Sequence, residues 1–538
     1  MTADPASAAP SPVRPAAGEH ETVLVLDFGG QYTQLIARRI RELRVYCEIH
    51  PFDLDVERIR ARRPIGIVLS GGPDSVYERN APQADPELLR LGIPVLGICY
   101  GMQWMAQVLG GRVAASGQRE YGRTRITLLA EGGGLFSGLG GEQNVWMSHG
   151  DRVEQLPAGF EASASTSTVP VVAAEDRERA LFGIQFHPEV THTDSGRQML
   201  RNFLFDACGA AGEWRMASYA DEATAAIKAQ VGPSDRVLCA LSGGVDSAVA
   251  ASLVRRAVGK RLTAVFVDNG LLRKNERTEV ERSLRQGLDL RLVVVDAAEE
   301  FLGALGGVTD PEQKRRTIGR VFIEVFQREA QRLEAAALGG GPIRYLVQGT
   351  LYPDVIESVS AFGPSAMIKS HHNVGGLPER LGFELIEPLR YLFKDEVRKL
   401  GRELGLGSEF VGRHPFPGPG LGVRILGDVT ADRVAVLQEA DAIFIDELRA
   451  AGLYDRVSQA LAVLLPVQSV GVMGDGRSYE NVVALRSVET EDFMTADWSQ
   501  LPHEFLGRVA GRIVNEVAGV NRVVYDLTSK PPGTIEWE

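Results

Sequence analysis

A loop of serine, glycine and aspartate follows an apolar run near the middle of the chain. Its sequence is Ser-Gly-Gly-Val-Asp-Ser at residues 242–247, and a helical stretch follows from Ala248 to Val258. Gly243 and Gly244 let the backbone approach an anion closely, and the amides that open a helix have no intrahelical acceptors. The alternative is a plain strand-to-helix turn, but the serines and the aspartate in register favour a phosphate-binding site.

This phosphate loop lacks the lysine of the common nucleotide-binding loop. That loop reads Gly-x4-Gly-Lys-Ser/Thr, and the Gly259-Lys260 pair fits no such pattern because Arg261 follows it. Asp246 instead supplies a carboxylate that can hold Mg2+ on a pyrophosphate. We therefore expect the loop to handle pyrophosphate rather than a single γ-phosphoryl group, with Asp246 as the metal ligand.

A cysteine between two glycines marks a second reactive centre. Gly97-x-Cys99-x-Gly101 ends the apolar run that begins at Ile93. A tight strand-to-helix turn with small neighbours holds the central side chain clear of the backbone, at a helix start whose dipole favours a thiolate. A single cysteine is more often a small buried hydrophobe, but the flanking glycines favour a nucleophile.

A cysteine nucleophile needs a base to take the proton of its thiol. The sequence Gly183-Ile-Gln-Phe-His-Pro-Glu supplies His187, with Glu189 two residues later. We predict that His187 takes the proton and that Glu189 orients the ring. Pro188 favours an extended segment, which is consistent with both side chains lying at the carboxyl edge of a sheet, where doubly wound folds bind ligands.

Alternating apolar runs and helical stretches predict the elements that position these groups. Such alternation is typical of parallel sheets covered on both faces. After Pro415, proline and glycine punctuation, a helix near 431–450 and short alternating runs predict a different, α+β region. The fold class expected is therefore α/β, with two doubly wound parallel-sheet domains followed by a small α+β domain. The apolar runs are Thr22–Phe28, Val45–His50, Ile65–Ser70 and Ile93–Ile98, then a second series that begins at Arg236 and continues at Leu262–Asp268, Leu290–Asp296 and Ile343–Gln348.

Composition excludes several classes of protein. The chain has 538 residues, 44% of them hydrophobic, which is enough for several cores. A net charge of −12 argues against a nucleic-acid partner. The sequence contains no run of eighteen apolar residues, so it predicts no membrane span. The four cysteines are too few for a disulfide framework, so a reducing cytoplasm fits best. The start of the chain, rich in alanine and proline, has no signal-peptide pattern and is expected to be disordered.

Several segments carry a resemblance to known families. The phosphate loop resembles that of the ATP pyrophosphatases, which split ATP into AMP and pyrophosphate to adenylylate an oxygen, and this alone leaves several substrates open. With five further segments, the chain from Glu21 to Glu538 resembles the glutamine-hydrolysing GMP synthases. These segments are residues 267–273, 348–354, 369–378, 413–421 and the terminal Ser-Lys-Pro-Pro-Gly-Thr-Ile-Glu-Trp-Glu at 529–538.

The N-terminal centre is similar to that of the class I glutamine amidotransferases. Ser70-Gly71-Gly72-Pro73 and Met147-Ser148-His149-Gly150-Asp151 strengthen the match. The resemblance implies that Cys99 forms a γ-glutamyl thioester and releases ammonia. It also implies that amides near Gly72 and Tyr100 stabilise the oxyanion, and that Gln103 and Asp151 hold the glutamine.

The resemblance implies the rest of the reaction. An oxygen of XMP attacks the α-phosphorus of ATP, pyrophosphate leaves, and ammonia displaces AMP to give GMP, with Mg2+ as cofactor. The third domain would form a homodimer and return the C-terminal tail to the acceptor site. Lys394 also fits the first turn of an amphipathic helix, and the basic run at 314–316 also fits a solvated helix face. The residues implied are Ser242, Gly243, Gly244, Val245, Asp246, Ser247, Asp268 and Lys394 for ATP, and Arg315, Asp475, Lys530 and Glu536 for XMP.

The domain boundaries follow from breaks in the pattern and from the resemblance. We expect a disordered tail at 1–20, an amidotransferase domain at 21–208, an ATP pyrophosphatase domain of the adenine-nucleotide α-hydrolase type at 213–412, and a dimerisation and acceptor-nucleotide domain at 413–538.

Two rival functions remain open at this point. A glutamine-dependent NAD or asparagine synthetase would share the phosphate loop, but nothing requires it to carry the terminal segment 529–538. A non-catalytic nucleotide sensor would be expected to lose Cys99, His187, Glu189 or Asp246, and all four are present.

Overall fold

The computed structural model describes residues 20–129, 134–336, 341–359, 382–473, 476–490, 493 and 495–538. The described chain divides into two compact units. Among the described residues, the N-terminal unit comprises those from 20 to 219 together with 355–359, and the C-terminal unit comprises those from 220 to 354 and from 382 to 538. The predicted disordered tail lies almost wholly outside the described residues.

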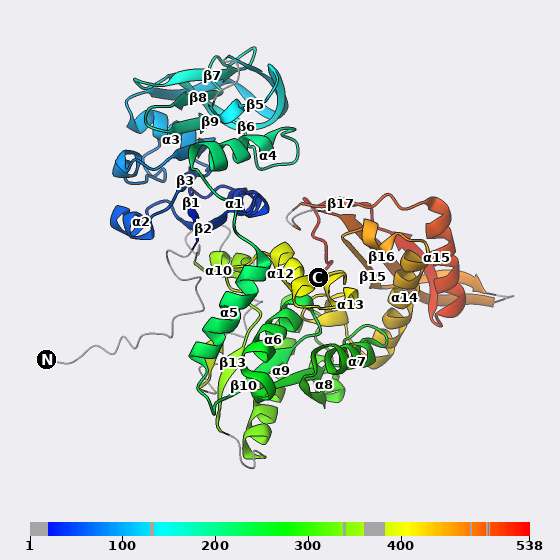
Figure 1. Ribbon diagram of the computed structural model, residues 1–538. Helices are drawn as coiled ribbons and strands as arrows, with labels where there is room; N and C mark the ends of the chain where they lie inside the picture. Colours follow the sequence, from blue (N-terminus) through cyan, green and yellow to red (C-terminus); the bar gives the residue numbers. More distant parts are fainter. Residues whose placement is uncertain are drawn as a thin grey trace. The chain divides into compact units, whose positions relative to one another are not determined.

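The N-terminal unit is built on one nine-stranded sheet in the order β2-β1-β3-β4-β9-β8-β7-β5-β6 (Figure 1). The first five of these strands are parallel, and four of them, β1 to β4, match the predicted apolar runs. The strands are β1 (Thr22–Asp27), β2 (Tyr46–Pro51), β3 (Gly66–Leu69), β4 (Val95–Ile98), β5 (Arg112–Leu128), β6 (Glu142–Gln155), β7 (Glu161–Ser165), β8 (Ala173–Asp176) and β9 (Leu181–Ile184). The helices are α1 (Thr33–Glu42), α2 (Val56–Arg62), α3 (Tyr100–Val108) and α4 (Gly196–Arg201), with the short turns η1 (Pro86–Arg90) and η2 (Gly134–Phe136) and the π-helical η3 (Asn202–Ala207).

Four antiparallel strands extend this sheet beyond its parallel half. Strands β8, β7, β5 and β6 pair antiparallel, and none of them was among the predicted apolar runs. Along β6, buried residues alternate with more exposed ones, so this strand carries no continuous apolar signal. The extension matters for function because β6 carries Asp151 toward the cysteine turn.

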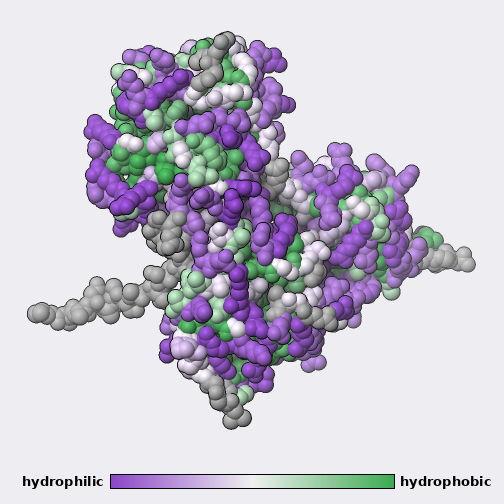
Figure 2. All heavy atoms as spheres, viewed as in Figure 1, coloured by the Kyte–Doolittle hydropathy of each residue, from purple (hydrophilic) through white to green (hydrophobic). Residues whose placement is uncertain are grey.

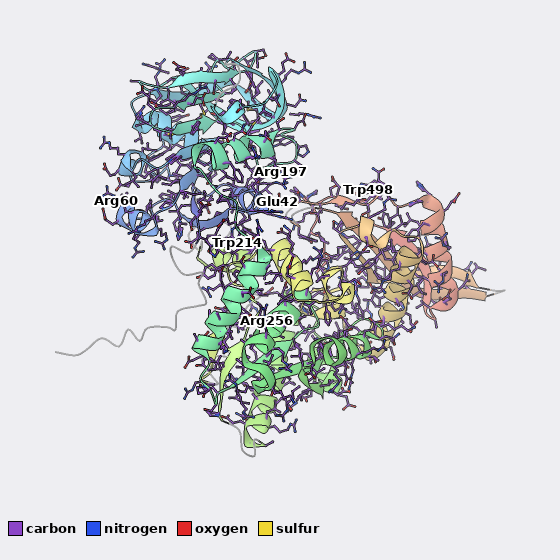
Figure 3. All side chains as sticks on the ribbon, in the orientation of Figure 1. Glu42, Arg60, Arg197, Trp214, Arg256 and Trp498 are labelled. Atoms are coloured by element: carbon purple, nitrogen blue, oxygen red, sulfur yellow. The ribbon has the colours of Figure 1, made fainter. Side chains whose placement is uncertain are left out.

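The C-terminal unit contains a five-stranded parallel sheet in the order β12-β11-β10-β13-β14. Its first four strands in chain order match the second predicted series. Arg256 of α6, which is labelled in Figure 3, pairs with Asp221 of α5 through Nη2 and Oδ1 at 2.6 Å. The strands are β10 (Arg236–Leu241), β11 (Leu262–Asp268), β12 (Arg291–Asp296), β13 (Ile343–Val347) and β14 (Glu384–Ile386). The helices are α5 (Met216–Gln230), α6 (Val245–Val258), η4 (Gly259–Arg261), α7 (Glu276–Leu288), α8 (Ala298–Leu305), α9 (Pro311–Ala335), α10 (Tyr352–Val359), α12 (Lys394–Glu403) and α13 (Ser408–Val411).

The last part of the chain forms the expected α+β arrangement within the same unit. A four-stranded sheet pairs β15, β16 and β17 antiparallel and adds β18 parallel to β16. One continuous core joins it to the parallel sheet, since Val265, Val325 and Phe444 belong to a single buried cluster. The elements are η6 (Gly420–Val423), α14 (Ala431–Ala450), η7 (Tyr454–Arg456), β15 (Gln459–Met473), β16 (Gly476–Glu489), β17 (Asp497–Trp498), α15 (His503–Glu516) and β18 (Val520–Tyr525).

Hydrophilic side chains cover much of the visible surface, with hydrophobic ones scattered among them (Figure 2). At the free end of the β15–β16 hairpin, hydrophobic spheres lie next to residues drawn in grey (Figure 2). Val470, Val472 and Tyr479 are 52%, 77% and 63% exposed there. Within the described residues, no helix combines the length and the apolar content that a bilayer crossing requires. All four cysteines are free thiols.

Candidate active sites

Cys99 stands on a sharp turn between β4 and α3. Its backbone has a φ of 52°, a left-handed conformation that a non-glycine residue rarely adopts. A Cβ on Gly97 would lie 2.7 Å from the carbonyl carbon of Gly101, and one on Gly101 would lie 2.5 Å from the carbonyl oxygen of Leu69. Only glycine fits at either position, so the turn predicted around Cys99 is packed tightly on both sides.

His187 and Glu189 meet beside this turn as predicted from their spacing. His187 Nδ1 lies 2.7 Å from Glu189 Oε1, and neither side chain is more than 6% exposed. Burial by itself lowers the pKa of His187, but the Glu189 carboxylate and a hydrogen bond to Cys99 raise it by more, so the pKa lies well above its ordinary value. The ring is therefore suited to hold the proton of the Cys99 thiol.

The predicted oxyanion residues lie together beside Cys99. A Cβ on Gly72 would be 3.1 Å from Cγ of Tyr100, so the two residues are in direct contact. Tyr100 is the first residue of α3, where the backbone N–H has no intrahelical acceptor. The helix start therefore offers both a free donor and a favourable dipole to a developing negative charge.

The two predicted glutamine-binding residues also contact each other. Gln103 Nε2 donates to the carbonyl oxygen of Asp151 at 3.1 Å. The Asp151 carboxylate accepts a hydrogen bond from the hydroxyl of Tyr77 at 2.9 Å. Sequence reasoning missed Tyr77, which follows the Ser-Gly-Gly-Pro motif by a few residues and carries no reactive group to mark it.

The phosphate loop in the C-terminal unit connects β10 to α6. Gly243 has a φ of 76°, which places it in the left-handed region. Ser242 Oγ lies 3.2 Å from Ser247 Oγ and receives a hydrogen bond from the Gly244 amide at 3.4 Å. Ser242 and Gly244 are exposed, whereas Gly243 and Val245 are buried. The open side of the loop therefore presents hydroxyls and the start of a helix.

Asp246 and Lys394 form an ion pair across this loop through Oδ2 and Nζ. Lys394 is also the first residue of α12, which confirms the helix start, and its contact with ATP stays a prediction. Asp246 Oδ1 is buried and has no hydrogen-bond partner, which leaves one carboxylate oxygen available. A hard cation bridged to phosphate oxygens needs such a ligand, so the residues fit Mg2+. No group of three or more metal-binding side chains occurs among the described residues.

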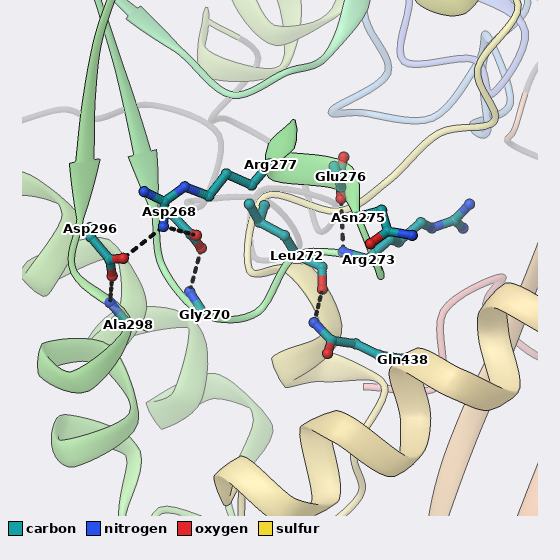
Figure 4. A pocket seen from close by; sticks show the side chains of 10 residues that line it. All are labelled: Asp268, Gly270, Leu272, Arg273, Asn275, Glu276, Arg277, Asp296, Ala298 and Gln438. Atoms are coloured by element: carbon teal, nitrogen blue, oxygen red, sulfur yellow. Dashed lines mark hydrogen bonds and ion pairs between the residues drawn. The ribbon is translucent and has the colours of Figure 1, made fainter. Parts of the chain in front are cut away.

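A pocket of about 230 Å³ opens at the carboxyl ends of β11 and β12. Asp268, predicted to contact ATP, lies in its wall, where Oδ2 pairs with Arg277 at 3.1 Å and Oδ1 accepts the Gly270 amide at 3.0 Å (Figure 4). Arg277 also pairs with Asp296 at 2.6 Å. This edge is where parallel sheets bind ligands, and the volume suits part of a nucleotide rather than a whole one.

The C-terminal residue lies against the start of α9. The buried Lys314 donates from Nζ to Glu538 Oε2 at 2.5 Å and to the carbonyl oxygen of Ile425 at 2.6 Å. Arg315, a predicted XMP residue, donates to the carbonyl oxygen of Glu538 at 2.5 Å. The basic run at 314–316 is thus partly buried, and for Lys314 the alternative of a solvated helix face is wrong.

Glu536, also predicted for XMP, is held by other residues of the same unit. Its two carboxylate oxygens accept from Arg424 Nη2 and Nε at 2.8 and 3.0 Å, and Gln459 Nε2 donates to Oε1 at 2.7 Å. Arg424 is completely buried. Sequence reasoning missed Lys314, Arg424 and Gln459, because nothing in their local sequence marks them as partners of the tail.

The remaining predicted acceptor residues are separate from this group. Lys530 Nζ donates to the carbonyl oxygen of Phe493 at 2.7 Å, and its backbone pairs with Ala496. Asp475 lies outside the described residues, and so does the segment at 369–378. Arg315 therefore contacts Glu538, two residues from Glu536, whereas the Lys530 side chain is bound to Phe493.

Curated relatives match almost the whole chain. GMP synthase (glutamine-hydrolyzing) of Phenylobacterium zucineum is 59% identical over 524 residues, which are 97% of this chain and 99% of the relative. The protein of the same name from Azoarcus is 57% identical, covering 96% of this chain and all of the relative. That of Carboxydothermus hydrogenoformans is 58% identical, covering 96% and 99%.

This chain belongs to the glutamine-hydrolysing GMP synthase family. Residues 24–207 match the family model for class I glutamine amidotransferases, and residues 446–537 match that for the GMP synthase C-terminal domain. Residues 235–298 match a model described as the HUP domain of a tRNA methyl transferase. That match covers only the phosphate loop, the strands β10, β11 and β12 and the helices between them, so the full-length relatives decide the family. The predicted family and enzyme class are confirmed.

Proposed function

We propose that this chain makes GMP from XMP, with ATP as the activating substrate and glutamine as the source of ammonia. The products are GMP, AMP, pyrophosphate and glutamate. The observation that carries the proposal is the presence of two separate centres, a cysteine turn and a pyrophosphate-type loop, in a chain that matches GMP synthases from end to end. An amidotransferase centre supplies ammonia, and an adenylylating centre supplies the electrophile that ammonia attacks.

Glutamine hydrolysis begins with transfer of the Cys99 proton to His187. The thiolate attacks the carboxamide carbon of glutamine, and the amides of Gly72 and Tyr100 hold the oxyanion. His187 then gives its proton to the departing ammonia, and a water molecule attacks the thioester with His187 as base. Glu189 supports this cycle because its carboxylate, 2.7 Å from Nδ1, holds the protonated ring in place.

Nucleotide activation is assigned to the phosphate loop. Residues 242 to 247 hold the phosphates of ATP, and Asp268 lies where the ribose and base pass. The 2-oxygen of XMP attacks the α-phosphorus and pyrophosphate leaves. Lys394 neutralises negative charge on the phosphates once ATP separates it from Asp246. Mg2+, when bound through Asp246, neutralises the charge that builds up on pyrophosphate.

The Asp246 assignment is tested by replacing it with asparagine. Asp246→Asn removes the charge while keeping the shape, so ammonium-dependent GMP synthesis should need at least about tenfold more Mg2+. An unchanged Mg2+ dependence contradicts the assignment.

The acceptor site is proposed at the tail, with Arg315, Lys530 and Glu536 around XMP and Asp475 as a further member. Arg315→Met should raise the KM for XMP by about tenfold and leave the KM for ATP within about twofold, because one charged hydrogen bond is lost. Equal increases in both constants contradict the assignment.

We further propose a homodimer formed by the last sheet, in a reducing cytoplasm. Support comes from the exposed Val470, Val472 and Tyr479, which form an apolar face on the β15–β16 hairpin. Val472→Glu should convert a dimer to a monomer in sedimentation experiments. A monomeric wild-type chain contradicts the proposal.

The four cysteines, none of which forms a disulfide, support a reducing compartment.

The overall function is tested by product formation from XMP, ATP and Mg2+ with either glutamine or ammonium. Cys99→Ala should lose glutamine-dependent GMP synthesis by at least about 10³-fold and keep ammonium-dependent synthesis. AMP and pyrophosphate should appear in equal amounts with GMP. If the intact chain makes neither GMP nor AMP from XMP, the acceptor is wrong.

A further inference from the structure

Gln185 lies directly behind the cysteine nucleophile and has been given no role so far. It follows β9, two residues before His187, and its side chain is completely buried. Its Nε2 lies 3.6 Å from Cys99 Sγ, within hydrogen-bond distance of a sulfur acceptor. An amide is costly to bury unless its polar atoms have partners, so this position is not ordinary core.

The orientation of the Gln185 amide follows from a chain of hydrogen bonds. The carbonyl oxygen of Asp151 can only accept, so the Gln103 side chain must point its Nε2 toward it, at 3.1 Å. The same Nε2 lies 3.1 Å from Gln185 Oε1, which must then be the acceptor. Nε2 of Gln185 is consequently the atom that faces Cys99, and it can only donate.

The other neighbours of the sulfur show why a donor is needed there. Cys99 Sγ lies 3.7 Å from the carbonyl oxygen of Ser148, which accepts from a thiol but repels a thiolate. His187 also contacts the sulfur, but it can no longer donate a hydrogen bond to the sulfur once it has given its proton to ammonia. Gln185 cannot titrate, so its donor stays in place through the whole cycle.

We propose that Gln185 is a positioning residue that stabilises the Cys99 thiolate through Nε2 and holds the sulfur toward the glutamine carboxamide. Gln103 and Asp151, the proposed glutamine-binding residues, fix the direction of this amide, so the substrate site and the nucleophile share one hydrogen-bond chain. The inference rests on the proposed function for its kinetic part, whereas its thiolate part concerns Cys99 alone.

The direct measurement is the pH dependence of Cys99 alkylation by iodoacetamide, with the modified peptide identified by mass spectrometry. Burial raises the pKa of both Cys208 and Cys239 to about 12, so these thiols should stay unreactive at neutral pH. Gln185→Leu removes the donor, and the midpoint pH of alkylation should rise by about one to two units. Gln185→Glu keeps an acceptor for Gln103 but faces the sulfur with a carboxylate oxygen, so its midpoint should rise further.

A matched control separates this role from a loss of packing. Asn202 is another buried amide of the N-terminal unit, and it donates to the carbonyl oxygens of Leu135 and Ser137, each at 2.9 Å. Asn202→Asp should lower the melting temperature without moving the alkylation midpoint. A shift in this control equal to that of Gln185→Glu would overturn the inference.

Kinetics give the second readout. Gln185→Leu should lower kcat for glutamine hydrolysis by about tenfold or more while KM changes by less than about threefold, and ammonium-dependent synthesis should be unchanged. If both Gln185 variants fold and keep the alkylation midpoint of the wild type, the inference is overturned, whether or not the chain makes GMP. Absence of GMP synthesis in the wild type, with the midpoint shifts intact, overturns the proposed function alone.

Discussion

At the scale of single residues, the site controls how the proton of the Cys99 thiol passes to His187. Burial alone lowers the pKa of His187, and the buried Glu189 carboxylate is the charge that reverses this effect. The result is a ring that holds a proton to higher pH than an ordinary histidine does. The same carboxylate therefore sets both the orientation and the charge of the ring.

Glu189→Gln should move the alkaline limb of the glutaminase pH profile to lower pH. Without the carboxylate, burial dominates and the pKa of His187 falls, so the imidazolium loses its proton earlier as pH rises. We expect kcat to fall by about 10²- to 10⁴-fold, as for other buried partners of catalytic histidines. Steady-state glutaminase assays across pH measure both effects.

Glu175→Gln is the matched control for that variant. Glu175 is another buried carboxylate of the N-terminal unit, and it pairs with the exposed Arg177 at 2.6 Å. Its replacement should leave the pH profile where it is. A Glu189→Gln profile with an unmoved alkaline limb would show that another group controls the proton.

At the scale of elements, the turn between β4 and α3 aims the nucleophile. Its geometry depends on glycines that pack against neighbouring backbone, and the positive φ of Cys99 is maintained by that packing. Each glycine therefore acts on catalysis without touching substrate.

Gly101→Ala tests the turn. The new Cβ would meet the carbonyl oxygen of Leu69 at 2.5 Å, so β3 and α3 must separate. We expect a loss of about 1–3 kcal/mol in unfolding free energy and a fall in glutaminase kcat. Gly140→Ala is the control, since a Cβ there meets no atom within 4 Å and the unfolding free energy should hardly change. Chemical denaturation of the N-terminal unit measures both, and equal stabilities would contradict the packing argument.

His414, between α13 and η6, makes the stability of the C-terminal unit depend on pH. Its ring stacks on Tyr454 with a centroid distance of 3.8 Å, Nε2 donates to the carbonyl oxygen of Tyr454, and Nδ1 is buried without a partner. Burial lowers the pKa of His414 to about 4, and the positive charges of Arg273 and Arg398 act in the same direction. The unfolded chain binds this proton near pH 6.5 and the folded chain does not.

The folded protein should therefore lose stability as pH falls from about 6.5 to about 4, by up to about 3 kcal/mol. Above pH 6.5 both states are neutral at His414 and the effect vanishes. His414→Gln should show a smaller loss over the same range when melting is followed by calorimetry. A variant that loses as much stability as the wild type would assign the pH dependence to other groups.

At the scale of the whole molecule, the chain's last residues complete the core of the C-terminal unit. Glu538 and Glu536 neutralise the completely buried Lys314 and Arg424, which lie 224 and 112 residues away in sequence. A buried cation without its partner costs about 3–5 kcal/mol. The tail is thus both part of the proposed acceptor site and a condition for the stability of the unit that contains it.

Removal of residues 536–538 should abolish ammonium-dependent GMP synthesis and lower the melting temperature of the C-terminal unit. Alkylation of Cys99 should be unaffected, because Cys99 belongs to the other unit. Trp537→Phe is the control within the tail, since it removes only the hydrogen bond from Nε1 to Asp526. A truncated chain that keeps ammonium-dependent synthesis would contradict the proposed acceptor site.

The sequence by itself determined most of the parallel strands and indicated where both candidate centres lie. These signals are local: Gly97-x-Cys99-x-Gly101 and the loop at 242–247 each constrain their own backbone, and apolar runs report strands buried on both faces. His187 and Glu189 were found because their spacing and chemistry suit a cysteine nucleophile.

Only the tertiary structure decided which distant groups face one another. Gln185 is an ordinary amide in sequence, and Lys314 and Arg424 look like surface cations. Their roles depend on burial and on partners that the fold brings close, such as Cys99 Sγ for Gln185 and Glu538 for Lys314. The antiparallel β5–β6 extension was missed for a related reason, because its solvated face interrupts the apolar pattern. Residue type sets what a side chain can do, and the dielectric and the partners around it, which the fold alone supplies, set what it does.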